Sequence, residues 1–248
     1  MPELVHHATE SPREAPWHAG LRAARANVVP GLMVQAVMVS LLIAYFLHPP
    51  TRDFLGRMAE VKVRWGYAYS ALTAVVAGGL IPELLRIFVF QGGKVERANF
   101  SNFLFAASFW AGMGVLVDAF YRLQVSWWGD EATAAVVVPQ VLVDQFIFSP
   151  FVTAPLTTWL YEWKNRGYRM GPGFFTLGYY RKNIFPTVVA IWGVWIPIVT
   201  VLYLLPEPVQ MPMYSLALTM WVMLYTWMSE ERLRGSDRGS VRNPIESE

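Results

Sequence analysis

Six long apolar stretches constrain more than any other feature what this chain can fold into. They cover residues 27–48, 67–90, 101–128, 132–161, 183–205 and 213–228. A membrane-spanning helix needs about 20 mostly apolar residues, because the hydrocarbon core of a bilayer is about 30 Å thick. Only 15% of the residues are charged, whereas soluble domains carry about 25%. The sequence therefore predicts an all-α integral membrane protein, a bundle of five to six transmembrane helices with kinks at proline.

The apolar stretches define one membrane helical domain, residues 27–229. Residues 1–26 form a polar N-terminal segment, and residues 230–248 form a polar tail that cannot bury apolar surface. Between the first two stretches, Phe54, Met58, Val61 and Trp65 recur at helical spacing with cations between them. This segment is either an amphipathic helix lying on the membrane surface or a polar connecting loop.

The distribution of Lys and Arg predicts an orientation. Cations concentrate in the 163–182 loop and in the C-terminal tail, and the loop between the last two stretches has none. The positive-inside rule therefore places both termini and the 163–182 loop on the cytoplasmic side of a bacterial inner membrane or an organellar membrane. The basic segment 52–64 then falls on the opposite side. Either it lies flat on the membrane or one of the six stretches does not cross.

Several function classes are disfavoured by composition. The chain has no cysteine, which excludes thiol ligands and thiol catalysis, and none of its four histidines lies inside a long apolar stretch. We therefore expect no cofactor and no metal. A net charge of +2 gives no reason to expect nucleic acid as a partner. Phosphate-loop, nucleophile-elbow and zinc-protease motifs are missing. We expect a protein that is not an enzyme and has no catalytic residues.

Two pairs of opposite charges lie within the apolar stretches, where ionised groups are costly. Glu83 follows Pro82 in the second stretch, with Arg86 one turn further on. Asp118 and Arg122 are four residues apart, so they share a helix face. Each pair is either a local ion pair that stabilises the bundle or part of a polar surface facing a solute. Tyr121 is a further polar candidate beside the second pair.

Asp144 and Gln145 form a third candidate, without an opposite charge within a turn. One interpretation is a buried hydrogen bond to a Tyr or Trp of another helix. The other is a carboxylate that faces an ion or solute and can exchange protons. A pore would bring Glu83, Asp118 and Asp144 to one lumen. In the third stretch, small residues four apart predict close helix packing: Ala107 with Ala111, and Ser108 with Gly112.

Four stretches together resemble the 22-kDa peroxisomal membrane protein family, also called the Mpv-seventeen family. The matching segments are Gly114 to Tyr121, Asp144-Gln145 followed by Pro150, Trp192 with Trp195 and Pro197, and Trp227-Met-Ser229. His48-Pro49 and Leu72-Thr73-Ala74 fit the family's first two helices. Where the family has a histidine, this chain has Asp118. The resemblance implies a multi-span protein of an organellar or bacterial inner membrane with channel-like activity.

These observations favour a small channel-like or solute-conducting helical bundle, with membrane lipid as its surroundings. The alternative is a non-catalytic accessory subunit of a larger membrane complex, packed against other subunits and against pigment, quinone or lipid. Aromatic content of 15% suits both.

Overall fold

The computed structural model describes residues 21, 25, 28–171 and 173–223. Across these ranges every regular element is a helix and none is a strand. Five helices are long and apolar enough to cross a membrane: Val28–Leu47, Tyr67–Phe90, Arg97–Trp128, Ala134–Asn165 and Leu177–Tyr203. The predicted all-α membrane bundle is therefore confirmed. The polar tail, 230–248, and nearly all of segment 1–26 lie outside the described residues.

Most crossing segments combine α-helix with short π-helices, labelled η. The first is α2 (Val28–Leu47). The second consists of α4 (Tyr67–Val75), η1 (Val76–Leu80), α5 (Ile81–Leu85) and η2 (Arg86–Phe90). The third is α6 (Arg97–Trp128), and the fourth consists of α7 (Ala134–Val143), η3 (Asp144–Thr153) and α8 (Ala154–Asn165). The fifth consists of α9 (Leu177–Tyr179), η4 (Tyr180–Ile184) and α10 (Phe185–Tyr203). A last helix covers 207–223.

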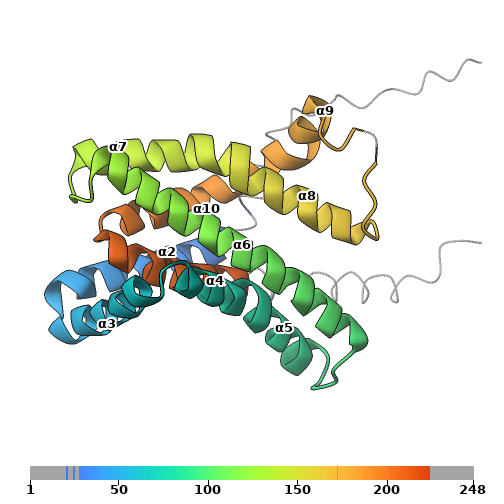
Figure 1. Ribbon diagram of the computed structural model, residues 1–248, viewed down its shortest axis with the longest axis horizontal. Helices are drawn as coiled ribbons and strands as arrows, with labels where there is room; N and C mark the ends of the chain where they lie inside the picture. Colours follow the sequence, from blue (N-terminus) through green and yellow to red (C-terminus); the bar gives the residue numbers. More distant parts are fainter. Residues whose placement is uncertain (1–20, 22–24, 26–27, 172, 224–248) are drawn as a thin grey trace, which may run out of the picture.

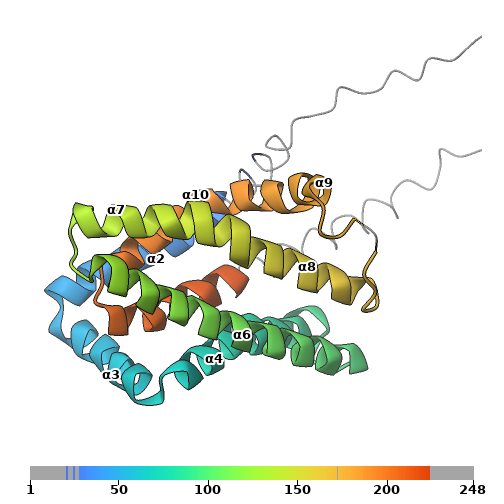
Figure 2. The same cartoon turned by 45° about the horizontal axis from the view of Figure 1, so that its top comes forward.

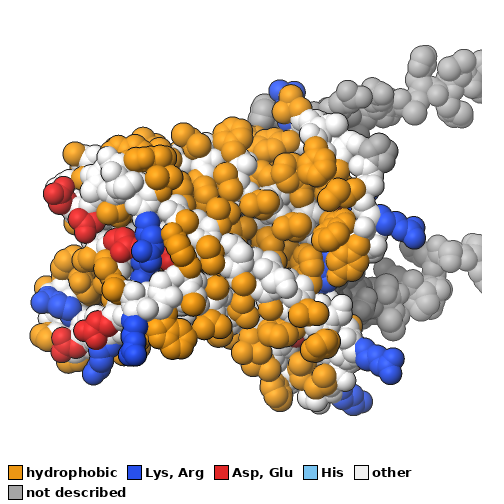
Figure 3. Space-filling model, viewed as in Figure 1, with side chains coloured by type: hydrophobic (Ala, Val, Ile, Leu, Met, Phe, Trp, Pro, Cys, Tyr) orange, Lys and Arg blue, Asp and Glu red, His pale blue; other side chains and the backbone are white. Residues whose placement is uncertain are grey.

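Successive crossing segments run in opposite directions along the bundle (Figures 1 and 2). The connections 91–96 and 166–176 consequently lie at one end, and the connection 129–133 lies at the other together with α3 (Pro49–Trp65). The face in Figure 3 has charged side chains at both ends and hydrophobic side chains between them. This apolar band is the surface expected of a helical bundle that contacts lipid.

Two helices begin earlier than the apolar pattern indicates. α6 begins at Arg97 rather than at 101, because the backbone N–H of Glu96 donates to Asn99 Oδ1 at 2.6 Å and so caps the helix. The fifth crossing begins at Leu177 rather than at 183, where Thr176 Oγ1 accepts from the backbone N–H of Tyr179 at 3.2 Å. The predicted sixth stretch, 213–228, is helical from 207, and its part beyond 223 lies outside the described residues.

The fourth crossing is one continuous helix, although its sequence predicts interruptions at three prolines. Pro139 and Pro150 lie inside helical segments, and Pro155 lies in the first turn of α8. Proline lacks an N–H and cannot donate to the helical ladder. The chain accommodates Pro150 by widening into the π-helix η3, a form that often marks functional positions.

The segment after the first crossing is a helix, α3, which excludes the connecting-loop interpretation. It begins at Pro49 and Pro50, where the missing N–H groups cost nothing. Its buried face consists of Leu55, Ala59 and Lys62. Of the apolar residues that suggested an amphipathic helix, Phe54, Val61 and Trp65 are exposed, whereas Met58 is partly buried against the core. The apolar side chains of α3 thus point mainly away from the bundle.

Close packing between α4 and α6 depends on Gly114. A side chain at this position would collide with the backbone carbonyl of Ser70 and with Ala74. Gly112 faces open space, and Ser108 is exposed, so this pair of small residues does not mediate the close approach predicted from its spacing. Helix 207–223 contributes many of the most buried side chains of the core, including Met211, Met213 and Ala217.

Candidate functional site

A cavity of about 1140 Å³ lies between the crossing segments. Its walls come from α6, from η3 and α8, from α10 and from helix 207–223. At one end the lining includes the exposed residues Glu96 and Asn165, which form its mouth beside the 91–96 connection. At the other end it reaches the buried residues Tyr121, Asp144 and Gln145. The cavity therefore enters deep into the apolar bundle from one end.

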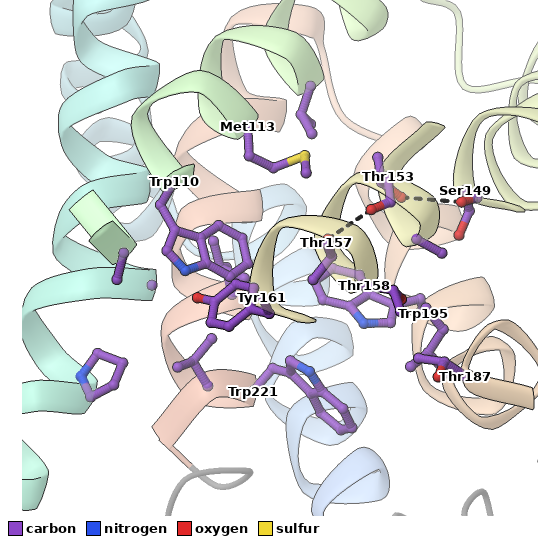
Figure 4. A pocket seen from close by; sticks show the side chains of 18 of the residues that line it. Trp110, Met113, Ser149, Thr153, Thr157, Thr158, Tyr161, Thr187, Trp195 and Trp221 are labelled. Carbon is purple, nitrogen blue, oxygen red and sulfur yellow. Dashed lines mark hydrogen bonds between the residues drawn. The ribbon is translucent and has the colours of Figure 1, made fainter. Parts of the chain in front are cut away.

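One wall of the cavity is polar along its length. Ser149, Thr153, Thr157 and Tyr161 follow one another at intervals of four residues and all line the cavity. Residues four apart share one face of a helix. Thr157 Oγ1 donates to the carbonyl of Thr153 at 2.7 Å, and Thr153 Oγ1 donates to that of Ser149 at 3.4 Å (Figure 4). The hydroxyls keep lone pairs available as acceptors.

Aromatic and apolar side chains from other helices complete the walls. Trp110 and Met113 come from α6, Trp195 from α10, and Trp221 from the last helix (Figure 4). The cavity thus combines one polar face with large apolar faces, as small-molecule sites commonly do.

Asp144 and Gln145 lie at the closed end of the cavity and are 6% and 3% exposed. Asp144 Oδ2 accepts from the Tyr203 hydroxyl at 2.7 Å, and Oδ1 accepts from Gln145 Nε2 at 2.9 Å. No Lys, Arg or His among the described residues pairs with this carboxylate. The hydrogen bond to a Tyr of another helix agrees with one of the two interpretations made from sequence. The other interpretation, a carboxylate that faces an ion or solute, requires Asp144 to line the cavity, and it does.

A cluster of tyrosines closes the cavity around Asp144. The Tyr121 ring lies edge-on to that of Tyr203, with centroids 5.3 Å apart. The Tyr214 ring lies 6.1 Å from that of Tyr121. Tyr121 and Tyr203 are 2% and 1% exposed, so the closure is tight.

The prolines of η3 and α8 leave two carbonyls without their π-helical donors, which would come from five residues further on. The Gln145 carbonyl would pair with residue 150, and the Pro150 carbonyl with residue 155, but both are prolines. Instead, Trp192 Nε1 donates to Gln145 O at 2.9 Å, and the Tyr180 hydroxyl donates to Pro150 O at 3.0 Å. The fifth crossing thereby holds the wide part of the fourth in place.

Glu83 and Arg86 line the outer part of the cavity and form an ion pair at 3.2 Å. Asn99 Nδ2 donates to Glu83 Oε1 at 2.6 Å, and Lys164 Nζ donates to Asn102 Oδ1, also at 2.6 Å. The charges near the mouth are therefore held by neighbouring polar groups.

Asp118 and Arg122 belong to a separate cluster at the opposite end of the bundle and do not line the cavity. Arg122 Nε lies 3.1 Å from Asp118 Oδ1, as the spacing predicts. Asp118 also accepts from Ser70 Oγ at 2.7 Å and pairs with the buried Lys62 at 3.3 Å, and Lys62 pairs with Glu207. Glu83 and Asp144 line the same cavity and Asp118 does not, so the three acids do not converge on one lumen, as a pore was expected to require.

Sequence reasoning did not identify Lys62 or the Ser149–Thr153–Thr157 series as part of these sites. The series carries a signal, hydroxyl residues four apart within an apolar stretch that contains Asp144. Among the residues of the family resemblance, Trp195 lines the cavity, Trp192 contacts Gln145, and Pro197 lies inside α10. Trp227 and Ser229 lie outside the described residues.

Comparisons of the chain with protein-family models, with curated proteins and with solved structures found no match.

Proposed function

We propose that this membrane protein is a channel-like, solute-conducting bundle whose cavity holds the solute. One observation carries the proposal: a polar wall extends through an apolar bundle from an exposed mouth to a buried carboxylate. Lys164 at the mouth and Asp144 at the closed end are separated along their helix by roughly 25–30 Å, since an α-helix rises 1.5 Å per residue. Polar side chains inside a membrane bundle commonly mark a solute path.

The closed end has polar groups behind it as well. Gln124 Nε2 donates to the carbonyl of Gln140, and Gln140 Nε2 donates to that of Gly129, each at 2.9 Å. Gln124 and Gln140 are both buried, and Gly129 lies in the connection at the far end of the bundle. A path across the membrane would require the Tyr121–Tyr203 contact and the buried apolar side chains around it to separate. In this proposal the structure represents a state that is open at one end.

The proposal includes no catalytic role and is supported by the family resemblance. The segments that match the family best, Asp144-Gln145 and Trp192, meet at the closed end of the cavity. We propose membership of the Mpv-seventeen family on that basis. The membrane would be a bacterial inner membrane or an organellar one, with the 163–182 loop on the cytoplasmic side.

Introduced cysteines test the path directly, because the natural chain has none. Thr153→Cys and Thr157→Cys, in protein reconstituted into vesicles, should react with a membrane-impermeant cationic thiol reagent, and reaction should block solute flux. Phe151→Cys is the matched control, since Phe151 belongs to the same helix but is exposed outside the cavity. Unreactive cavity cysteines would overturn the proposal. Absence of any flux, together with co-purification of stoichiometric partner subunits, would establish the accessory-subunit alternative instead.

A further inference from the structure

We infer that the closed end of the cavity binds the protonated amino group of a small amine. This inference rests on the proposed function and specifies its solute class. Asp144 supplies the negative charge. Glu83 also lines the cavity but pairs with Arg86, and Asp118 pairs with cations outside the cavity. Because no cation of the described chain pairs with it, its charge is available to a ligand. Attraction between opposite charges is strong where water is largely excluded.

The hydrogen-bonding atoms beside the charge favour a donor ligand. Each Asp144 oxygen accepts one hydrogen bond from the protein and keeps a further lone pair. Gln145 Oε1 is buried and has no hydrogen-bond partner in the described part of the chain. The Gln145 amide orientation is fixed by its donation to Asp144, so the oxygen remains the unpaired acceptor. An ammonium group has three N–H donors and no acceptor, which matches this set.

The surrounding walls favour an organic cation over a bare metal ion. Tyr121, Tyr214 and Trp195 line this part of the cavity, and aromatic faces attract organic cations. Calcium and magnesium require six or more oxygen ligands, whereas Asp144 is the carboxylate at this end. No group of three or more His, Asp or Glu suited to a metal exists within the described ranges. A cavity of about 1140 Å³ also has room for an apolar body attached to the amine.

The test is equilibrium binding to the full-length protein in phosphatidylcholine nanodiscs. Tryptophan fluorescence reports binding, because Trp110, Trp195 and Trp221 line the cavity. The probes are hexylammonium and hexanol, which share an apolar tail and differ in charge. Hexylammonium should bind at least about tenfold more tightly than hexanol, since tenfold corresponds to one modest charged interaction. Equal affinities for the two probes would overturn the inference.

Asp144→Asn should abolish the preference for hexylammonium while leaving hexanol binding unchanged. Asn retains the shape, and rotation of the Gln145 amide satisfies the new amide group, so the fold should persist. Asp130→Asn, at an exposed position at the far end of the bundle, is the matched control and should keep the preference. Should Asp144→Asn fail to fold, Asp144→Glu keeps the charge and should keep the preference. A preference that survives Asp144→Asn refutes the site.

Two further arms identify the ligand. Displacement of hexylammonium by sodium at equal concentration would overturn the amine assignment in favour of an inorganic ion. Weaker hexylammonium binding in phosphatidylethanolamine nanodiscs would support the ammonium site and name a lipid headgroup as its natural source, and unchanged binding would support a soluble amine. Binding without flux would refute the proposed conduction alone. Flux that is insensitive to charge and to Asp144→Asn would refute this inference alone.

Discussion

Tyr180→Phe should destabilise the protein by removing a single hydroxyl that replaces a missing backbone donor. In the structure this hydroxyl donates to the Pro150 carbonyl at 3.0 Å. Its aromatic ring stays in the variant, including the stacked contact with Phe151 at 6.5 Å between centroids. The perturbation is therefore confined to one hydrogen bond and the carbonyl that it satisfies.

The size of the stability loss depends on whether another donor can reach the Pro150 carbonyl once the hydroxyl is gone. A typical hydrogen bond contributes about 0.5–1.5 kcal/mol, and interhelical hydrogen bonds in membrane bundles average about 0.6 and reach about 1.7 kcal/mol. The Pro150 carbonyl lies within a helix where water is scarce and Pro155 offers no N–H. We therefore expect a loss of about 1 kcal/mol in the free energy of unfolding, measured by denaturing-detergent titration.

Pro155→Ala provides the decisive comparison, since it restores an N–H whose π-helical acceptor is the Pro150 carbonyl. In this background Tyr180→Phe should cost less than half as much. The double-mutant cycle cancels the effect of Pro155→Ala on the unfolded chain. Tyr179→Phe is the matched control: it neighbours Tyr180, is similarly half-buried, and should change nothing. An equal loss from Tyr180→Phe in both backgrounds would refute the reasoning.

Three other predictions follow from the packing, the buried charges and the orientation. Gly114→Ala should lower the free energy of unfolding by about 1–3 kcal/mol through overpacking, while Gly112→Ala, which faces open space, should change it little. A loss from Gly112→Ala equal to that from Gly114→Ala would contradict the packing described. Lys62→Met should destabilise by about 1–3 kcal/mol, because Glu207 loses its cation and the buried Asp118 loses one of its two; detergent-melting curves unchanged from the natural chain would contradict this. Gly167→Cys and Asp130→Cys should be labelled from opposite sides of sealed vesicles by an impermeant reagent. Labelling of both cysteines from the same side would disprove the alternation of the helices.

The elements that sequence predicts well are those dominated by burial in lipid. The first and second crossings match the predicted ranges almost to the residue, because apolar length alone decides them. Helix starts are less accurate, since capping by Asn99 and Thr176 depends on short local hydrogen bonds outside the apolar pattern. The continuous fourth crossing was unpredictable from its prolines. Its stability depends on donors from Trp192 and Tyr180, which lie far away in sequence.

Among the candidate residues, too, contacts between neighbours in sequence are predictable, whereas contacts between distant segments are not. The Asp118–Arg122 pair is local in sequence and is present at 3.1 Å. Lys62, its buried partner, is one of the cations between the apolar residues of segment 52–64, and nothing in its neighbourhood in sequence indicates that it is buried. Gly112 has the spacing of a packing residue but faces open space, whereas Gly114 makes the close contact. The helix rotation that decides this comes from the packing of the whole bundle.

The two buried acids in the middle of the chain have different physical meanings despite similar burial. Asp118 meets Lys62 and Arg122 and a hydroxyl donor, so its cluster is neutralised within the protein and has no contact with the cavity. Such a cluster can stabilise or orient helices but leaves no attraction for a ligand. Within the described part of the chain Asp144 has neutral donors alone, although burying an uncompensated carboxylate is costly. A protein that neutralises one buried acid and leaves another open to a cavity retains the second for something that enters the cavity, and this asymmetry makes Asp144 the residue on which function should depend.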